Sequence, residues 1–370
     1  MDSVTWIHHL FQDLRASQIK TFTAIWVAFI QCESAILNKI AAQMMRQSGI
    51  GVEHTLKRIN RFLSNPRIDR RVVYAGITRF VWRRIRHWKT VPIAWDWTYC
   101  EEYHEWQVLA ASVIVRGRGI PILVWAFKKN KFGSELSQNR VEEAFLRELH
   151  ELIKECRRPN QTIVIMADRG FPRPKLFELI RELDFHYVIR ITNNVSVTMG
   201  NETMAVGNIA LAKGEQQTFH SIKYRRDKAL TIPRLVAVRP KRVPKGKKLD
   251  PWFLVSSLCR GSDAIIRLYE LRFTIEEDFR TMKSNFNWGK SRIHLLEHYR
   301  QFLLLVVVAM LFAFMIGLAA HTKPSLMKGV VRRRKGKPDT SITVTGHRLL
   351  LRDLDCFAYI GKIDKLPYPL

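Results

Sequence analysis

The stretch RLYELRFTIEEDFRTMK, Arg267 to Lys283, decides the fold and the site that we expect around it. At about 100° per residue, one continuous helix places four of its side chains in a narrow stripe, namely Tyr269, Arg272, Glu276 and Lys283. A second face is apolar and can pack on a core; it holds Leu268, Leu271, Ile275, Phe279 and Met282. The third face is expected to meet water, and it holds Glu270, Thr274, Glu277, Asp278 and Thr281.

The stripe carries one acid, two permanent cations and a phenol. An acid that can hold a metal ion, beside cations that can hold phosphates, is what a phosphodiester-cutting site requires. The alternative is a surface helix stabilised by pairs four residues apart, such as Arg272 with Glu276. The helix alone favours neither interpretation.

The composition indicates a globular protein with a polyanionic partner. Of 370 residues, 47% are hydrophobic and 25% charged, which argues against a disordered chain. Lys and Arg number 61 against 33 Asp and Glu, a net charge of +28. Nucleic acid is the first candidate partner, and an anionic membrane surface is the alternative. The five cysteines form no CxxC pair, which argues against a structural zinc site and fits a reducing cytosol.

Two segments bear on the compartment. The N-terminal MDSVTWIHHLFQDL has no basic region followed by an apolar one, so we expect no signal peptide and a cytoplasmic protein. The stretch FLLLVVVAMLFAFMIGLAA, residues 302–320, is long and apolar enough to cross a bilayer. We favour the alternative of a helix buried on all sides in a large domain, and therefore no membrane contact.

The first 88 residues are expected to be helical. Helices are predicted near residues 3–14, 17–32, 34–47, 52–62 and 69–88, with Ser17 and Ser34 as candidate N-caps. Short helices that carry Lys57, Arg58 and Arg61 are typical of a helix-turn-helix-like DNA-binding domain. The alternative is a helical cap whose charges are simply solvated.

The middle of the chain predicts a mixed sheet. Strands are expected at 91–99, 106–117 and 120–127, then a helix at 137–156, a strand at 161–167, a helix to 183 and a strand at 186–191. This order is that of an RNase H-like α/β core. We expect domains at 1–88 (helical), 89–191 and 251–325 (the core in two parts), 192–250 (a β-rich insertion) and 326–370 (a basic linker and C-terminal element).

Three acids are candidates for the chemistry. Asp96 lies inside an apolar strand, where an ionised carboxylate is costly unless a cation compensates it. Asp168 follows the strand IVIMA, and Glu276 comes from the helical stripe. Together they can hold two divalent ions, and Mg²⁺ suits an all-oxygen site. The alternatives are a core Asp96 paired to an arginine and an Asp168 that only caps a turn. The histidines form no metal-binding pattern.

Beyond this point the chain resembles a known family. Tyr269, Arg272, Glu276 and Lys283 match, without a gap, the Y-(2)-R-(3)-E-(6)-K signature of insertion-sequence-4 type DDE transposases, of the RNase H-like superfamily. The segments around Asp96 and Asp168 resemble those around that family's two aspartates. The resemblance covers residues 90–290.

The resemblance implies a cut-and-paste transposase that nicks transposon ends, forms and opens a hairpin, and joins the 3′ ends to target DNA. It implies that Asp96, Asp168 and Glu276 are the catalytic metal ligands for two Mg²⁺, which Mn²⁺ can replace. It also implies phosphate contacts at the end of the element, for which the candidates are Tyr269, Arg272, Lys283, Arg190 and Arg169.

Relatives place an aromatic ring before this helix in the space that a flipped base leaves, and Trp252 is the candidate here, unless it is an ordinary core residue. The implied partners are double-stranded DNA, as terminal inverted repeats and as target, and a second copy of the chain in the DNA complex. The implied location is cytoplasmic, on the nucleoid of a bacterium. The alternative function is a DNA-binding protein that derives from a transposase and has lost its chemistry.

Overall fold

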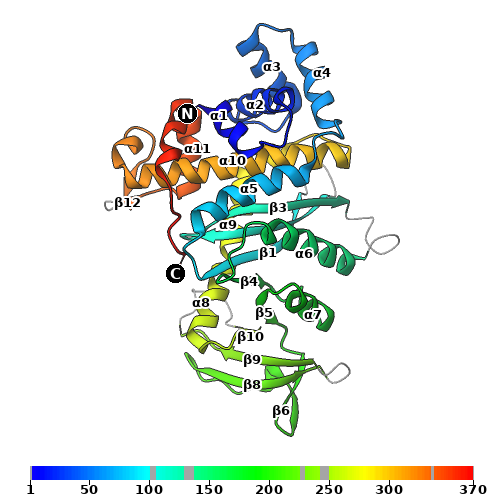
Figure 1. The fold of residues 1–370 in the computed structure, drawn as a ribbon. Coiled ribbons are helices and arrows are strands. Elements are labelled where there is room, and N and C mark those ends of the chain that lie inside the picture. The colour runs from blue at the N-terminus through cyan, green and yellow to red at the C-terminus, as the bar shows by residue number, and fades with distance from the viewer. Residues whose placement is uncertain are drawn as a thin grey trace.

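The fold is described here from a computed structural model, over residues 2–100, 106–128, 137–225, 230–241, 250–334 and 337–369. A ten-stranded mixed sheet runs through the molecule with helices against it (Figure 1). Its strand order is β3-β2-β1-β4-β5-β10-β9-β8-β6-β7.

The first half of the sheet follows the predicted order of strands. β1 (Thr90–Cys100), β2 (Trp106–Val115) and β3 (Arg118–Lys128) form an antiparallel meander. β4 (Thr162–Ala167) lies parallel to β1, and β5 (His186–Ile191) lies parallel to β4. The helices α6 (Gln138–Lys154) and α7 (Pro174–Glu182) make the connections. These buried strands are near-continuous apolar runs because both faces of the sheet are covered.

The β-rich segment predicted at 192–250 extends this sheet. It contains β6 (Ser196–Met199), β7 (Glu202–Ala205), β8 (Gln216–Tyr224) and β9 (Leu230–Val238). β10 (Trp252–Ser256) joins the two halves by pairing antiparallel with β5 on one side and β9 on the other. Residues 242–249, near the end of this segment, lie outside the described residues.

The N-terminal helices differ from the prediction at their ends. They are α1 (Ser3–Leu10), α2 (Ala16–Gln31), α3 (Leu37–Ser48), α4 (Val52–Leu63) and α5 (Arg70–Ile85). Ser17 and Ser34 were wrongly predicted as N-caps, because Arg15 and Ile36 occupy the cap positions of α2 and α3. The Ser34 hydroxyl accepts from the Ile36 amide at 3.3 Å, so it shapes the turn before α3.

The apolar stretch at 302–320 lies inside α10 (Leu296–Thr322), the one helix among the described residues that is long and apolar enough to span a bilayer. Every residue of its most apolar 18-residue window is buried in the fold, which confirms the prediction of a helix covered on all sides. α10 packs against β3, α2, α5 and α11 (Ile342–Arg352). Gly317 and Gly346 permit the closest approach, because a Cβ on either residue would lie under 2 Å from a carbonyl oxygen of the other helix.

The C-terminal part of the chain consists of short elements around α11. A two-stranded ribbon of β11 (Arg333–Arg334) and β12 (Lys337–Pro338) precedes α11, and the 3₁₀ turns of η5 (Leu354–Lys362) follow it. One cluster of buried side chains joins α1, α2, α5, the sheet, α10, α11 and η5. The N-terminal helices therefore share a core with the rest of the chain.

Candidate active site

The sheet brings the two aspartates together. β1 and β4 run parallel, with Ala94 opposite Met166, so Asp96 and Asp168 each follow this pair by two residues. Alternation along a strand puts both side chains on the face that Ala94 and Met166 share, and paired strands lie about 4.8 Å apart. Asp168 directly follows β4, and its Oδ1 accepts from the Gly170 amide at 2.8 Å.

A buried arginine links the strand acid to the helix acid. Nη1 of Arg272 lies 3.0 Å from Oδ2 of Asp96, and its Nη2 lies 2.6 Å from Oε1 of Glu276. The Arg272 side chain is 6% exposed, that of Asp96 15% and that of Glu276 51%. Arg272 and Asp96 are therefore largely buried, whereas half of the Glu276 side chain is exposed to solvent.

The signature segment is two helices, so the prediction of one continuous helix was wrong. α8 (Ser262–Arg272) ends just before Phe273, and α9 (Thr274–Ser284) begins just after it. The Phe273 amide donates to Glu270 and its carbonyl accepts from Glu276, both at 3.3 Å and both three residues apart. This tighter turn separates Arg272 from Glu276, yet the two side chains still meet.

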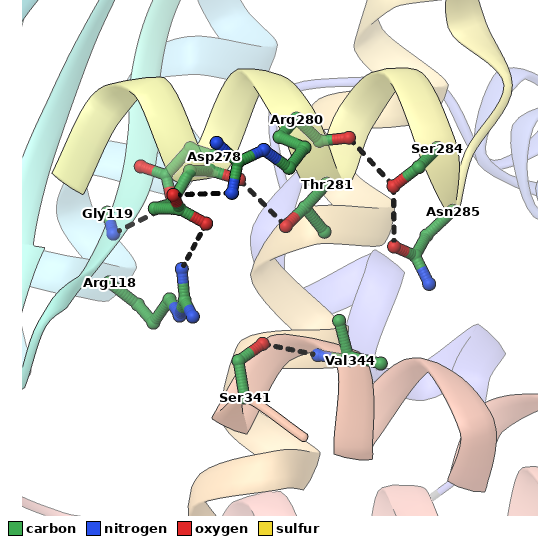
Figure 2. Close-up of polar contacts among 10 residues, drawn as sticks. Arg118, Gly119, Asp278, Arg280, Thr281, Ser284, Asn285, Ser341 and Val344 are labelled. Carbon is green, nitrogen blue, oxygen red and sulfur yellow. Dashed lines mark hydrogen bonds and ion pairs between the residues drawn. The ribbon is translucent and has the colours of Figure 1, made fainter. Parts of the chain in front are cut away.

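The face predicted to meet water is partly buried, because the helix edge packs on the β2–β3 turn. Asp278 is 1% exposed, and its Oδ1 accepts from the Gly119 amide at 3.1 Å (Figure 2). A Cβ on Gly119 would lie 1.9 Å from Oδ2 of Asp278, so only glycine permits this contact. Thr274 and Thr281 are buried as well. Asp278 thus ties α9 to β3 from the side opposite Glu276.

Burial and charge set the protonation of these acids. Burial raises the pKa of Asp96 to about 7; Arg272 opposes this, while Asp168 and Glu276 add to it. Burial alone would lower the pKa of Arg272, but Tyr269, Asp96 and Glu276 together raise it, so it stays a cation. Burial also raises the pKa of Asp278 to about 8. The mutual effect of Asp96, Asp168 and Glu276 places all three carboxyls in one electrostatic neighbourhood.

The three acids offer a divalent cation only oxygen donors. Within the ranges described above, no three acidic, His or Cys side chains are gathered closely enough to hold a metal ion as they stand. The Arg272 guanidinium instead occupies the space between two of them. The donor set still fits a hard cation, because Asp96 is a buried carboxyl whose ionisation the neighbouring carboxylates oppose, and added positive charge relieves that repulsion.

The other residues of the signature lie around these acids. Tyr269 is 1% exposed and packs edge-on against Trp252, with ring centroids 5.3 Å apart. Burial raises the pKa of Tyr269, and the nearby charges of Arg272 and Arg190 oppose this rise. Arg190, on β5, donates from Nη2 to the Pro251 carbonyl at 3.4 Å. Trp252 is half-buried and also contacts Phe273 at 5.7 Å between centroids. Trp252 thus lies in an aromatic cluster at the site, and it keeps part of its surface open.

The remaining predicted cations are more scattered. Lys283 is exposed in the last turn of α9, and Arg169 is exposed beside Asp168. Lys57, Arg58 and Arg61 lie on α4, which Figure 1 shows at the far end of the molecule from β6 and β8, with α10 between it and the sheet. The fold therefore does not bring the α4 cations to the acids. Glu101 and Glu102, which follow β1 in the sequence, lie outside the described residues.

A buried ion pair that sequence reasoning missed supports the Asp168 loop. Glu142, on α6, is 1% exposed and pairs with Arg173, the last residue before α7. Glu142 also accepts from the Trp97 indole nitrogen at 2.8 Å. Trp97 follows Asp96, and Arg173 ends the loop that begins at Asp168. Glu142 therefore holds both the residue next to Asp96 and the end of the Asp168 loop. The sequence offered one signal for this pair, which was Trp97 in a core strand, because a buried indole nitrogen usually needs a hydrogen-bond acceptor.

Comparison with known proteins bears on the family. Residues 138–312 match the family model described as the transposase DDE domain. The matched segment contains Asp168 and Glu276, and Asp96 lies before it. No curated protein sequence matches the chain significantly.

Among solved structures, the chain is similar to the piggyBac transposase, seen by cryo-EM in a synaptic complex with hairpin DNA. The TM-score is 0.51 at 12% sequence identity, over 95% of this chain and 73% of that one. At this identity the likeness concerns the fold. The family match concerns residues 138–312, just under half of the chain, and indicates a transposase DDE domain there.

Proposed function

We propose that this protein is a metal-dependent DNA transposase that cuts its element out of DNA and joins it to a target. The observation that carries the proposal is that Arg272 contacts both Asp96 and Glu276, while Asp168 follows the strand beside Asp96 and acts on its pKa. Two strands and a helix edge supply these acids. The transposase DDE match over residues 138–312 supports the same reading of the fold.

The roles of the residues follow from their positions. Asp96, Asp168 and Glu276 would hold divalent cations, Mg²⁺ by the hardness of the donors. When bound, such cations activate the attacking oxygen and stabilise the leaving one. Arg272, at the end of α8, and the exposed Lys283, in the last turn of α9, supply positive charge for phosphates. The half-exposed Trp252 ring can replace the stacking of a base that leaves the duplex.

The finer steps belong to the proposal too. We place nicking, hairpin formation and opening, and strand transfer in one site with an RNase H-like core of the insertion-sequence-4 type. That the similar structure is a synaptic complex with hairpin DNA supports a hairpin step and an assembly on paired ends. We expect terminal inverted repeats and target DNA as partners, a homodimer in the DNA complex, and a cytoplasmic location on the nucleoid.

The test is cleavage of duplex DNA that carries the element's end, with Mg²⁺ or Mn²⁺. The wild-type protein should produce a nick and then a hairpin, while Asp96→Ala, Asp168→Ala and Glu276→Ala should each lose cutting by a factor of about 10³ or more and keep DNA binding. Full cutting in any one variant would remove that residue from the site. Wild-type protein that binds ends and never nicks them would favour the alternative of a silent DNA-binding protein.

A further inference from the structure

A basic surface lies away from the acids, where α5 ends. A pocket of about 580 Å³ is lined there by Arg83, Arg84, Arg86 and Lys365. A second pocket, of about 640 Å³, adjoins it, because Asp364 and Lys365 line both. We call the two together the α5 basic face. It is built from segments far apart in the chain, which Figure 1 shows meeting beside the C-terminus.

The second pocket adds three more exposed cations. Arg116 comes from the β2–β3 turn, Lys323 from the end of α10 and Lys362 from η5. The ammonium groups of Lys323 and Lys362 each lie 5.4 Å from the centre of the Tyr359 ring. Cations at a helix end can be explained by the helix dipole, which accounts for Arg83 and Arg86 at the end of α5 and for Lys323 at the end of α10. It does not account for Arg116 in the β2–β3 turn or for Lys365.

The face is held together from within. The buried Arg84 donates from Nε to the Ile363 carbonyl at 2.9 Å, and the Leu366 amide donates to the Arg84 carbonyl at 3.0 Å. The Trp88 indole donates to the Leu366 carbonyl at 3.1 Å. The C-terminal segment is therefore fixed against α5, and its lysines are fixed relative to the α5 arginines.

The acids in reach offset little of this charge. Asp364 lines both pockets, and Asp13 pairs with Arg79 at the edge of the first. Asp96 lies six residues after Thr90 on β1. Its partner on β2 is Ala110, which lies six residues before Arg116. At about 3.3 Å per residue the face lies roughly 20 Å from Asp96 along the sheet.

We infer that the α5 basic face binds the phosphate backbone of a DNA duplex at a place separate from the acids. Rigid cations from several elements, spread over two adjoining hollows, suit a polymer of phosphates better than one small anion. The inference rests on the proposed function only in taking DNA as the partner. It adds a second contact that would hold flanking or target duplex while the acids hold the cleaved end.

The test is the salt dependence of binding to a random-sequence 40-base-pair duplex. The variant R83E/R86E/K323E/K362E should bind more weakly and lose about 0.9 in slope per lost phosphate contact. The matched control R181E/K213E/R147E/K20E makes the same change in charge on exposed residues of α7, the segment before β8, α6 and α2. An equal loss in the control would overturn the inference, since net charge alone would then explain it.

Two further arms keep the outcome clear. R83E/R86E alone, checked by near-ultraviolet circular dichroism, repeats the test with a milder change. Vesicles rich in phosphatidylserine replace DNA in the second arm; a loss confined to the vesicles would overturn the inference in favour of a membrane partner. D96N should bind the duplex with the wild-type slope, so loss of cutting leaves this inference untouched.

A second inference rests on Arg272 alone. Its guanidinium contacts Asp96 at 3.0 Å and Glu276 at 2.6 Å, and its own Nε is buried with no hydrogen-bond partner among the described residues. It also lies over the Phe273 ring, 4.5 Å from the centre. The cation between the carboxylates is thus the protein's own, and it sits at the turn that joins α8 to α9.

We propose that Arg272 keeps metal ions out of the site until DNA arrives. A divalent cation must replace the guanidinium to be held by Asp96 and Glu276 together. A DNA phosphate offers Arg272 a bidentate partner of equal charge to the carboxylate it leaves. Binding of DNA and of metal would then favour each other, by the same factor in both directions. The coupling would keep the three carboxylates free of metal in protein that has not bound DNA.

The test is Mn²⁺ binding without catalysis, followed by the electron paramagnetic resonance signal of free Mn²⁺ at pH 8. DNA-free R272A should bind Mn²⁺ at least tenfold more tightly than wild type, and wild type should gain a similar factor when duplex is added. R272Q keeps the stem and an amide, and replaces R272A if that variant unfolds. R280A is the control, because Arg280 is exposed on α9 and pairs with Glu277.

Wild type that binds Mn²⁺ equally well with and without DNA would overturn the second inference, as would R272A and R272Q that gain nothing. D96N should abolish the tight binding in R272A, which assigns it to this site. Protein that shows the coupling and never nicks DNA would overturn the proposed function and leave the role of Arg272 standing.

Discussion

At the scale of single residues, the acids divide into those that face the site and one that supports it. Asp96 and Glu276 meet on Arg272, whereas Asp278 is turned to the opposite side and hydrogen-bonds to the Gly119 amide. The prediction that Asp96 lies inside an apolar strand is confirmed. A buried carboxylate is costly unless a cation compensates it, so its position in that strand marked it as a candidate for function. The prediction that Asp278 faces water was wrong. The angular position of a residue on one helix does not show that Gly119, at the start of β3, covers that face.

Asp278 gives a prediction for stability against pH. Its pKa is raised from 3.8 to about 8 by burial, so the folded chain binds its proton more tightly than the unfolded chain. Stability of the metal-free protein should therefore fall as pH rises between about 4 and 8. D278N removes that titration and should flatten the fall in urea unfolding. The rise of the Asp96 pKa acts in the same sense, so D278N should leave part of the slope.

The control for that experiment is E178Q, since Glu178 is exposed on α7 and is not among the groups that act on the pKa of Asp278. A curve for D278N that keeps the full wild-type slope would contradict the burial of this carboxyl.

At the scale of elements, the site depends on how α9 is held against the sheet. Asp278 accepts a hydrogen bond from the Gly119 amide of β3 (Figure 2). Beside this contact, Nη1 of Arg118 lies 3.8 Å from Oε2 of the partly buried Glu277. Sheet order through β5 was predictable, since strand periods and turn glycines are local signals. The break at Phe273 was not predictable, because the sequence there contains neither Gly nor Pro and tertiary packing decides it.

Gly119→Ala tests the contact between α9 and β3. The new Cβ would lie 1.9 Å from Oδ2 of Asp278 and 2.8 Å from the Ser112 Cβ, so α9 must move. We expect a loss of about 1–3 kcal/mol in the free energy of unfolding and a larger loss in kcat than in KM for cutting, because Glu276 moves with α9. Gly289→Ala, with open space at its Cβ, should change stability by less than about 0.5 kcal/mol.

Glu142→Gln tests the support of the Asp168 loop. The variant leaves the largely buried Arg173 with a neutral partner. We expect the free energy of unfolding to fall by about 3–5 kcal/mol, as for a broken buried ion pair. Metal binding should weaken at the same time, because the loop from Asp168 to Arg173 loses its anchor. Unchanged Mn²⁺ affinity in a folded E142Q would show that the loop holds its shape without this pair.

At the scale of the whole molecule, one core joins parts that the sequence suggested as separate domains. Phe312, in the middle of α10, contacts Trp26 of α2 and Phe357 of η5, with ring centroids 5.5 and 4.9 Å apart. Composition and periodicity predict where helices and strands lie along the chain. They do not show that α2, α10 and η5 pack against one another. The boundaries at 88 and 192 stay predictions, whereas burial of residues 302–320 was foreseen and is confirmed.

The shared core predicts one cooperative unfolding transition. Helical circular dichroism and tryptophan fluorescence should report the same midpoint. Phe312→Ala should lower the stability by about 3–5 kcal/mol and move both signals together. Two separated midpoints, with only one of them shifted, would show an N-terminal unit that folds independently.

The central claim is that Asp96, Asp168 and Glu276 together hold the catalytic metal. The most direct measurement is a crystal structure of the protein with cleaved-end DNA and Mn²⁺, read by anomalous scattering at the manganese edge. We predict manganese peaks in contact with all three carboxylates and Arg272 turned to a DNA phosphate. Manganese bound elsewhere, with Arg272 still between Asp96 and Glu276, would contradict the account.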